Sequence, residues 1–406
     1  MKVHRILPQY NLILIRYNEI WLKSMKVKMR MLKTLMNNIT TKLNRAEIPF
    51  TKYQLSKDTA RVFFFFKSKY IEGALEQMKT VMGIHSFSPA LRTSNRMENI
   101  LERVLEVGES ILESGDSFAI RTKRSGTHPY SSQELAAEAG RAVLDHFKDR
   151  HLTVNLTAPD KTIFIEVRDN FSYIYTEILE SPWGGLPIEP NKKTLTLDVG
   201  RPEDLLGGFL LMRRGTVIFP VLFQMTENTR ELELYIENWR TVAKYFPSFS
   251  FRIRIIPLLK VMKQLKQAIR DSKYICAICR LLRFAIASRL INSEERDLSN
   301  VRALTDGVSL HNRTLCPDEV DLQTISLSYL FGRWPIFTPI IGFEEGEIES
   351  LLDKISESLK PIDYCDLKPE QQEFDQEEVK NLVESLELDE ICAEALKELK
   401  ELNLLE

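Results

Sequence analysis

The chain has 406 residues, of which 28% are charged and 44% are hydrophobic, and its formal net charge at pH 7 is −2. This composition is typical of a soluble globular protein, and the length predicts two to four domains of about 100–200 residues each. No window approaches the roughly 18 consecutive apolar residues that a membrane span needs. The first ten residues lack the apolar core of a signal peptide. We therefore expect a cytoplasmic protein with no membrane partner.

The charge is distributed unevenly along the chain. Residues 1–50 contain ten Lys or Arg and two Glu, a net charge of +8, whereas residues 371–406 contain twelve Asp or Glu and three Lys, a net charge of −9. A basic segment is the electrostatic signature of a polyanionic partner, although a solvated helix face has the same composition. The acidic tail is expected to form one or two surface helices. The opposite charges of the two ends are compatible with a homodimer in which the tail covers a basic surface.

The first 180 residues alternate short strands and helices. A strand begins within residues 11–21, and a basic helix follows from Lys23. The aromatic stretch 61–69 is expected to be a strand buried on both faces of a small α+β domain, rather than a stacking platform for bases. Further along, the pattern predicts a strand at 117–124, a helix at 131–149 with Ser131 as its N-cap, and strands at 152–156 and 162–179 with a turn at Asp169–Asn170.

After a stretch rich in Gly and Pro, the pattern changes to regular alternation. Strands are predicted at 194–199, 216–223, 251–258, 301–306 and 336–342, with helices at 203–213, 227–246, 260–292, near 317–331 and at 344–358. Such alternation predicts a parallel sheet with helices on both faces. Ligands of these sheets bind at the carboxyl ends of the strands, where Gly200 and Gly307 fall.

Several segments, taken in order, resemble the tRNA 4-thiouridine synthetase (tRNA sulfurtransferase) family in its archaeal type. YNEIWLKS (17–24) resembles the start of these proteins. GIHSFSPA (83–90), RTKRSGTHPYSSQEL (121–135) and GGLPI (184–188) resemble their THUMP region, a tRNA-binding module, and residues 195–365 resemble their ATP-pyrophosphatase domain.

The resemblance implies a division of the chain into five parts. These are an α+β ferredoxin-like domain (1–78), a THUMP domain (79–182), a linker (183–193), an α/β parallel-sheet domain of the adenine nucleotide alpha hydrolase or PP-loop type (194–368), and an acidic helical tail (369–406).

The resemblance also implies tRNA, and not DNA, as the partner. Arg121, Lys123 and Arg124 lie at a strand end, near the helix that opens at Ser131, and both features supply positive potential to a phosphate backbone. The alternative is a solvated strand edge. Lys23, Lys26 and Arg30 recur at helical spacing and are predicted to extend one basic stripe.

Two loops of the resembled family depart from its pattern here. The phosphate loop S-G-G-x-D-S aligns with residues 199–204 and retains only Gly200, because Arg201 replaces the second glycine and Pro202 has no N–H to donate. Glu203 and Asp204 add negative charge next to a negatively charged ligand. The later loop T-G-E-S-L-G-Q is DGVSLHN (306–312), in which the carboxylate is replaced by Val308. Gly200, Arg201, Gly307 and Ser309 remain the candidate nucleotide contacts, and the substitutions argue against binding of ATP and magnesium.

The five cysteines are expected to be reduced thiols. Cys276 and Cys279 lie three apart at the start of a predicted helix. The resemblance adds Cys365 and implies that the three thiolates hold an iron–sulfur cluster that carries sulfide. A zinc site, and small thiols that simply fill a helix–sheet interface, are the alternatives. Cys316 and Cys392 have no counterpart, and His128 and His311 are expected to be surface residues.

Two functions are compatible with this pattern. The first is an enzyme that thiolates a tRNA uridine, with ATP adenylating the base and a cluster at the three cysteines delivering sulfide. The second is a catalytically inactive tRNA-binding protein or accessory subunit that no longer binds ATP. In a mixed case the protein carries sulfur while a partner activates the tRNA.

Overall fold

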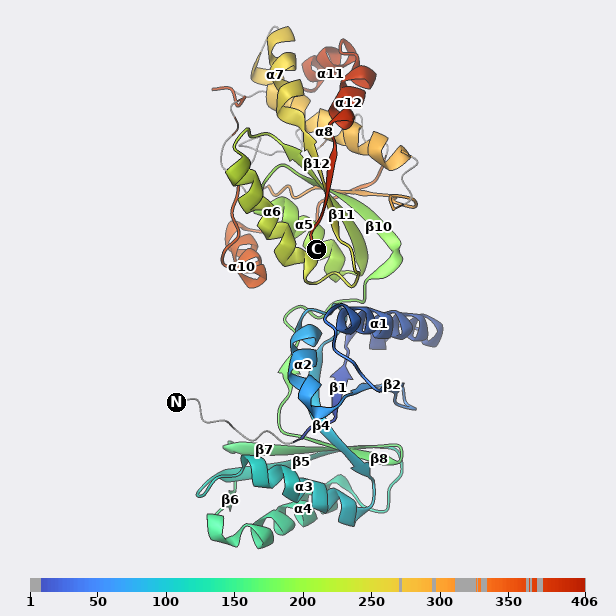
Figure 1. Ribbon diagram of the computed structural model, residues 1–406, viewed down its shortest axis with the longest axis vertical. Helices are drawn as coiled ribbons and strands as arrows, with labels where there is room; N and C mark the ends of the chain where they lie inside the picture. The colour runs from blue at the N-terminus through green and yellow to red at the C-terminus, as the bar shows by residue number, and fades with distance from the viewer. Residues whose placement is uncertain are drawn as a thin grey trace. The chain divides into compact units, whose positions relative to one another are not determined.

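The structure is a computed structural model that describes residues 9–269, 272–293, 297–310, 326, 328–329, 334–362, 365, 367–370 and 375–405. The chain forms two compact units, residues 1–187 and 188–406. Each has its own sheet and helices (Figure 1). The change between them falls within the predicted linker, but that segment is packed: Leu186 lies in the core of the first unit, and a strand begins at Glu189. Cys316, His311 and most of the predicted helix near 317–331 lie outside the described residues.

The first unit contains two α+β halves. Its elements are β1 (Leu12–Arg16), a 3₁₀ turn η1 (Glu19–Leu22), α1 (Met25–Arg45), β2 (Lys52–Leu55), β3 (Val62–Phe65), η2 (Ser68–Tyr70), α2 (Ile71–Lys79), β4 (Ser86–Ser94), α3 (Met97–Ile111), β5 (Ser117–Ser125), α4 (Ser132–His146), η3 (Lys148–Arg150), β6 (Thr153–Val154), β7 (Lys161–Arg168), β8 (Phe171–Tyr175) and β9 (Leu179–Glu180).

Strand β4 joins the two halves into one sheet. The strand order is β2-β3-β1-β4-β8-β7-β5-β6, with β9 paired to β4. The first part of β4, up to Ala90, pairs with β1, and the part from Leu91 pairs with β8. We call residues 9–90 the ferredoxin-like half and residues 91–180 the THUMP-like half. Because they share a continuous strand, their relative orientation is built into the sheet.

The aromatic strand β3 is buried on both faces, as predicted. Phe64 lies in the core formed with the helices, whereas Phe63 and Phe65 point to the opposite face of the sheet. There the ring of Phe63 stacks on Tyr173 of β8, with centroids 4.3 Å apart. Alternation along one strand therefore places one set of rings in the helical core and the other against the THUMP-like half.

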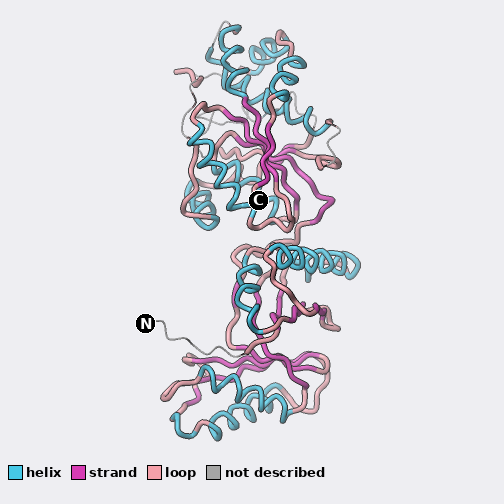
Figure 2. The backbone as a smooth tube through the Cα atoms, in the orientation of Figure 1, coloured by secondary structure: helices cyan, strands magenta, loops and turns pink. Residues whose placement is uncertain are grey.

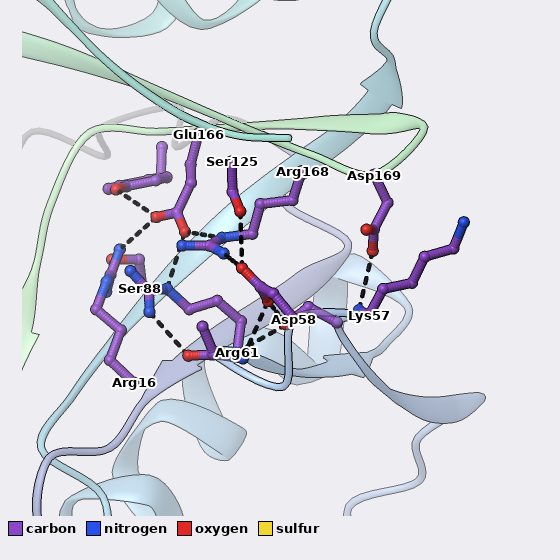
Figure 3. Close-up of polar contacts among 12 residues, drawn as sticks. Arg16, Lys57, Asp58, Arg61, Ser88, Ser125, Glu166, Arg168 and Asp169 are labelled. Atoms are coloured by element: carbon purple, nitrogen blue, oxygen red, sulfur yellow. Dashed lines mark hydrogen bonds and ion pairs between the residues drawn. The ribbon is translucent and has the colours of Figure 1, made fainter. Parts of the chain in front are cut away.

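A buried ion-pair network lies beside this aromatic contact (Figure 3). Glu166 of β7 is 1% exposed and accepts from Arg168, and the Nε of Arg61 of β3 lies 2.8 Å from its Oε1. Arg16 of β1 lies 3.9 Å from the same carboxylate. Burial opposes ionisation of Glu166, but Arg61 and Arg168 outweigh it and lower its pKa. One buried carboxylate thus contacts arginines from both halves, and Asp58 supplies a second carboxylate to Arg168. We call these four residues the Glu166 network.

The second unit is a six-stranded sheet with helices on both faces (Figures 1 and 2). Its elements are β10 (Glu189–Asp198), α5 (Pro202–Arg213), β11 (Thr216–Gln224), α6 (Thr229–Ala243), β12 (Arg252–Pro257), α7 (Leu258–Ala268), η4 (Ser272–Tyr274), α8 (Ile275–Asn292), β13 (Leu304–Thr305), β14 (Ile336–Phe337), α10 (Glu345–Ile355), α11 (Gln376–Glu384), α12 (Leu388–Lys397) and β15 (Lys400–Asn403).

The strand order β14-β13-β10-β11-β12-β15 confirms the predicted parallel sheet for all pairs except the last, which is antiparallel. Leu195 and Leu197 of β10 lie in a core with α7, α8, α11 and α12, whereas Thr196 faces α5 on the other side. The predicted helix 260–292 is two helices. A single helix of that length would extend about 50 Å, whereas α7 and α8 contribute to the same apolar core.

The acidic tail forms two helices, as predicted, but each helix has a buried face and a strand follows them. Val379 and Val383 of α11 and Cys392 of α12 are buried in the domain core, and β15 extends the sheet along β12. The tail acids also have partners in their own domain: Glu401 lies 2.7 Å from buried Arg254, and Glu398 lies 3.2 Å from Lys260. The tail therefore completes the domain, because it covers an edge strand that would otherwise expose unpaired backbone groups.

The Glu166 network predicts a large loss of stability for Glu166→Gln. Removing the carboxylate leaves buried Arg61 without its counter-charge and leaves Arg168 with Asp58 alone. Breaking a buried pair in this way typically costs about 3–5 kcal/mol. Urea unfolding measures the loss, and hydrogen exchange of the β3 and β7 amides assigns it to the first unit. Glu138→Gln is the matched control, because Glu138 forms an exposed pair with Arg141 on α4. Equal stabilities of the two variants would contradict the prediction.

Candidate functional site

The predicted RNA-binding residues form two separate surfaces in the first unit. Lys23 follows η1, and Lys26 and Arg30 lie on α1, all three exposed. Arg121 and Lys123 are exposed on β5. Figure 1 shows α1 and β5 at opposite ends of the unit, so the prediction of a single basic stripe is wrong. The sequence gives spacing along one element, whereas the fold decides which elements become neighbours.

The three cations of β5 also divide between two faces of the strand. Arg121 and Lys123 alternate with Thr122, whose hydroxyl donates to the Ser132 carbonyl of α4 at 2.6 Å. They therefore lie on the sheet face opposite α4. Arg124 lies on the α4 side, is partly buried, and donates to the His128 carbonyl at 3.4 Å. Arg121 and Lys123 are thus the pair that β5 offers to a polyanion, and Arg124 supports the loop before α4.

The N-terminus of α4 is capped as predicted. Ser131 Oγ accepts from the Glu134 amide at 3.1 Å, and Glu134 Oε2 accepts from the Ser131 amide at 2.7 Å. His128 has partners of its own, since Nε2 lies 3.0 Å from the Ser125 carbonyl oxygen. Because the capping box satisfies two of the first-turn amides internally, positive potential at this end comes mainly from side chains.

In the second unit, two aspartates close the turn between β10 and α5. Asp198, fully buried, accepts from the Gly200 amide at 2.7 Å, from Trp239 Nε1 at 2.6 Å and from the Tyr235 hydroxyl at 2.8 Å. Asp204 accepts from the Val199 amide at 3.1 Å. These amides are the groups that a phosphate would use, and carboxylates of the chain already bind them.

The side chain of Arg201 also binds a residue of the same loop. Its Nη2 and Nε donate to the two carboxylate oxygens of Asp204 at 2.7 and 3.0 Å, a bidentate pair in which both side chains are buried. Burial opposes the charge on Arg201, but Asp204 outweighs it and raises the pKa of the guanidinium. The prediction that Asp204 adds repulsive charge next to a ligand is wrong, because Asp204 turns inward and neutralises Arg201.

Protein atoms fill the space beside both predicted loop glycines. Gly200 has φ +93°, and a Cβ placed on it would lie 2.6 Å from the side chain of Ile362. A Cβ on Gly307 would lie 2.3–2.4 Å from the backbone of Glu203 and Asp204. The two loops therefore pack directly on the first turn of α5 and on Ile362. The residues present do not fit an ATP phosphate chain in the family manner.

The later loop is likewise satisfied within the protein. Ser309 donates to the Phe343 carbonyl at 3.1 Å, and Asp306 accepts from Arg280 of α8. Burial disfavours ionised Asp306, but Arg280 and Arg201 outweigh it and lower its pKa. All four candidate nucleotide contacts (Gly200, Arg201, Gly307 and Ser309) thus pack against or bond to groups of the protein.

The cysteines do not form a recognisable metal site among the described residues. Cys276 and Cys279 are buried in the apolar core at the start of α8, and Cys365 packs against the same core and is partly exposed. No group of three or more His, Cys, Asp or Glu side chains in the described part of the chain is placed to hold a metal ion. An iron–sulfur cluster, a zinc site and thiols that fill a helix–sheet interface all stay predictions for these three cysteines.

Sequence reasoning missed the residues that close the loop. Tyr235, Asn238 and Trp239 come from one face of α6, because residues three and four apart in a helix are neighbours. Tyr235 and Trp239 hold Asp198, and the Asn238 side chain makes two hydrogen bonds with the Lys360 backbone. The sequence signal for a closed turn was the presence of an acid on each side of it, Asp198 and Asp204, close to Arg201.

Models of known protein families and curated relatives match most of the chain in sequence. A model of the ThiI ferredoxin-like domain matches residues 12–88, a model of the THUMP domain matches residues 94–177, and the model described as thiamine biosynthesis protein (ThiI) matches residues 202–388. A probable tRNA sulfurtransferase of Methanosarcina acetivorans is 28% identical over 310 residues, which is 74% of this chain and 72% of that protein. One of Saccharolobus solfataricus is 29% identical over 298 residues, 72% of this chain and 75% of that protein.

Two solved structures share the fold. A 4-thiouridine synthetase–RNA complex with bound ATP superposes with a TM-score of 0.80 at 21% identity, covering 97% of this chain and 99% of that one. PH1313 from Pyrococcus horikoshii gives a TM-score of 0.63 at 23% identity, with coverages of 85% and 99%. Among the described residues, no helix has the length and apolarity needed to cross a bilayer.

The environment of Asp198 predicts a specific pH dependence of stability. Burial and the nearby Asp204 raise its pKa from 3.8 to about 7. The Tyr235 hydroxyl lies 2.7 Å from the Arg201 carbonyl oxygen, so protonated Asp198 can donate to Tyr235 while Tyr235 donates to that carbonyl. The folded state holds this proton more tightly than the unfolded state. Its contribution to stability is therefore fully present below about pH 4 and is lost as the pH rises to about 7.

The test compares urea unfolding of the wild type and Asp198→Asn between pH 4 and 8. The wild-type unfolding free energy should fall relative to the variant by at most about 1.4 kcal/mol per pH unit up to pH 7, and the difference should then stay constant. Parallel pH profiles of the two proteins would show that Asp198 is ionised throughout and contradict the assignment.

Proposed function

Because the chain belongs to the tRNA 4-thiouridine synthetase family, we propose that it acts on tRNA in a thiolation pathway, as a tRNA-binding protein that does not bind ATP through its own loop. The first unit binds tRNA, and the second unit is a scaffold or accessory domain. Activation of the uridine then falls to a partner that supplies the ATP chemistry.

The match of residues 94–177 to the THUMP domain and the exposed cations of the first unit support tRNA binding. Arg121 and Lys123 lie on one face of β5, and Lys23, Lys26 and Arg30 add a second basic surface at η1 and α1. Phosphate contacts of this kind position a nucleic acid without reading its sequence. Two separated basic surfaces on one rigid unit fit a long polyanion better than a small anion.

The closed β10–α5 turn is the single observation that carries the second half of the proposal. The amides of Val199 and Gly200 are bound by Asp204 and Asp198, and Ile362 fills the space beside Gly200. A nucleotide would have to displace the Asp198 and Asp204 side chains from their backbone donors and open the buried pair between Arg201 and Asp204. Breaking a buried ion pair costs about 3–5 kcal/mol, against roughly 8 kcal/mol for micromolar binding.

The second candidate is the enzyme, an ATP-dependent tRNA sulfurtransferase with sulfide on Cys276, Cys279 and Cys365. The names of the relatives that match about three quarters of the chain favour it. The described contacts of the loop do not. A direct assay of the purified protein decides between the two candidates.

Arg121→Ala and Lys123→Ala should each weaken tRNA binding and reduce the slope of log affinity against log salt by about one, because each removes one phosphate contact. Fluorescence anisotropy with labelled tRNA at several salt concentrations measures both quantities. Arg141→Ala is the matched control, since Arg141 is an exposed arginine on α4 that pairs with Glu138. Unchanged affinity and slope in both β5 variants would remove β5 from the interface.

Calorimetry of the anaerobically purified protein with ATP and magnesium should show no binding up to about 1 mM nucleotide, which corresponds to less than about 4 kcal/mol. Iron and acid-labile sulfide are assayed on the same sample. Micromolar ATP affinity together with stoichiometric iron and sulfide would establish the enzyme instead. Iron and sulfide without ATP binding would favour a sulfur carrier that depends on a partner for activation.

A further inference from the structure

The segment that fills the turn also leads to a cysteine. Residues 360–362, which we call the strap, follow α10 and lie three residues before Cys365. The strap is held at both of its ends by the second unit.

Three hydrogen bonds fix the backbone of the strap. The Asn238 side chain donates to the Lys360 carbonyl at 2.7 Å and accepts from the Lys360 amide at 3.1 Å. The Ile362 amide donates to the Gly200 carbonyl at 2.7 Å. Asn238 is only 4% exposed, so this pairing is shielded from water. A side-chain amide that satisfies both the N–H and the C=O of one residue acts like a short piece of β-sheet.

The side chain of Ile362 fixes the same segment sterically. It occupies the space that a side chain at position 200 would need, and Gly200 leaves it open. Asp198 accepts from the Gly200 amide in the turn, and Tyr235 and Trp239 of α6 donate to Asp198. One face of α6 therefore supports both the turn, through Tyr235 and Trp239, and the strap, through Asn238.

Cys365, three residues after the strap in the sequence, contacts the core of the second unit. Its side chain packs, partly buried, against the apolar core that contains Cys276 and Cys279. Its carbonyl accepts from the Lys368 amide at 3.1 Å, and Lys266 of α7 donates to the Leu367 carbonyl at 3.3 Å. Chain positions on both sides of Cys365 are therefore held in place, Ile362 by Gly200 and Leu367 by Lys266.

We propose that Gly200, Asn238 and Ile362 are positioning residues for Cys365. The turn between β10 and α5 holds the strap through Gly200, and the fixed strap keeps the Cys365 thiol against the core. The position of the thiol is independent of nucleotide, because the anchor is a part of the chain. This inference goes beyond the proposed function, since it concerns the cysteine whether or not the protein thiolates tRNA.

The test is the rate at which a small alkylating reagent modifies each cysteine, read by mass spectrometry of peptides from the intact protein. Asn238→Ala and Ile362→Ala should accelerate modification of Cys365 by roughly 5- to 30-fold, the change that one or two lost interactions produce in a local opening equilibrium. Cys392, fully buried on α12, is the internal reference for general loosening of the domain. Its rate should stay unchanged.

Two further variants and one added condition complete the experiment. Ile362→Val, which keeps a branched side chain beside Gly200, should restore most of the wild-type rate at Cys365. Ile341→Ala is the matched control, because Ile341 is a partly buried isoleucine of the same unit whose backbone bonds join Thr338 and Leu310. The wild type is also measured with ATP and magnesium, and its Cys365 rate should not change.

Several outcomes would overturn the inference. These are an unchanged Cys365 rate in Asn238→Ala and Ile362→Ala, equal acceleration of Cys365 and Cys392, or acceleration of Cys365 by ATP, which would mean that nucleotide displaces the strap. Failure here is distinguishable from failure of the proposed function, because alkylation of the variants is measured without nucleotide or tRNA.

Discussion

A buried charge must find a counter-charge within the fold, and this requirement joins the segments that define both units. Glu166 gathers arginines from β1, β3 and β7. Asp204 pairs with Arg201, and Asp306 pairs with Arg280. Removing one member of such a group leaves the other as a buried charge without a partner. The loss in folding free energy is then far larger than the net stabilisation that the intact pair provides. Each group therefore constrains the segments around it more strongly than its net energy implies.

In the second unit, buried polar groups of the chain close the turn between β10 and α5. The parallel sheet, the turn at the end of β10 and the helix that follows retain the arrangement in which related folds bind phosphates. Here the turn binds two carboxylates and is covered by Ile362. A fold can keep its architecture while its site changes, because packing depends on apolar alternation and the site depends on a few polar groups.

In the first unit, the same constraint joins the two halves into one rigid frame. The continuous strand β4, the stack of Phe63 on Tyr173 and the Glu166 network all connect the ferredoxin-like half to the THUMP-like half. The exposed cations of α1 and β5 therefore sit on a common rigid frame. Such a frame suits a partner that is itself long and stiff, because neither side has to be ordered on binding.

The sequence by itself determined the class of each unit, the family, the strands and helices of regular period, the cap at Ser131 and the loss of a phosphate-binding pattern at residues 199–204. These follow from local periodicity and residue chemistry. Only the tertiary structure decided that the cations of α1 and β5 are far apart, that Asp204 neutralises Arg201, that α6 and the strap close the turn, and that the acidic tail completes the sheet. The reason is that these contacts join residues distant in sequence, such as Gly200 with Ile362 and Asn238 with Lys360, and no local pattern encodes which distant partner a buried polar group will find.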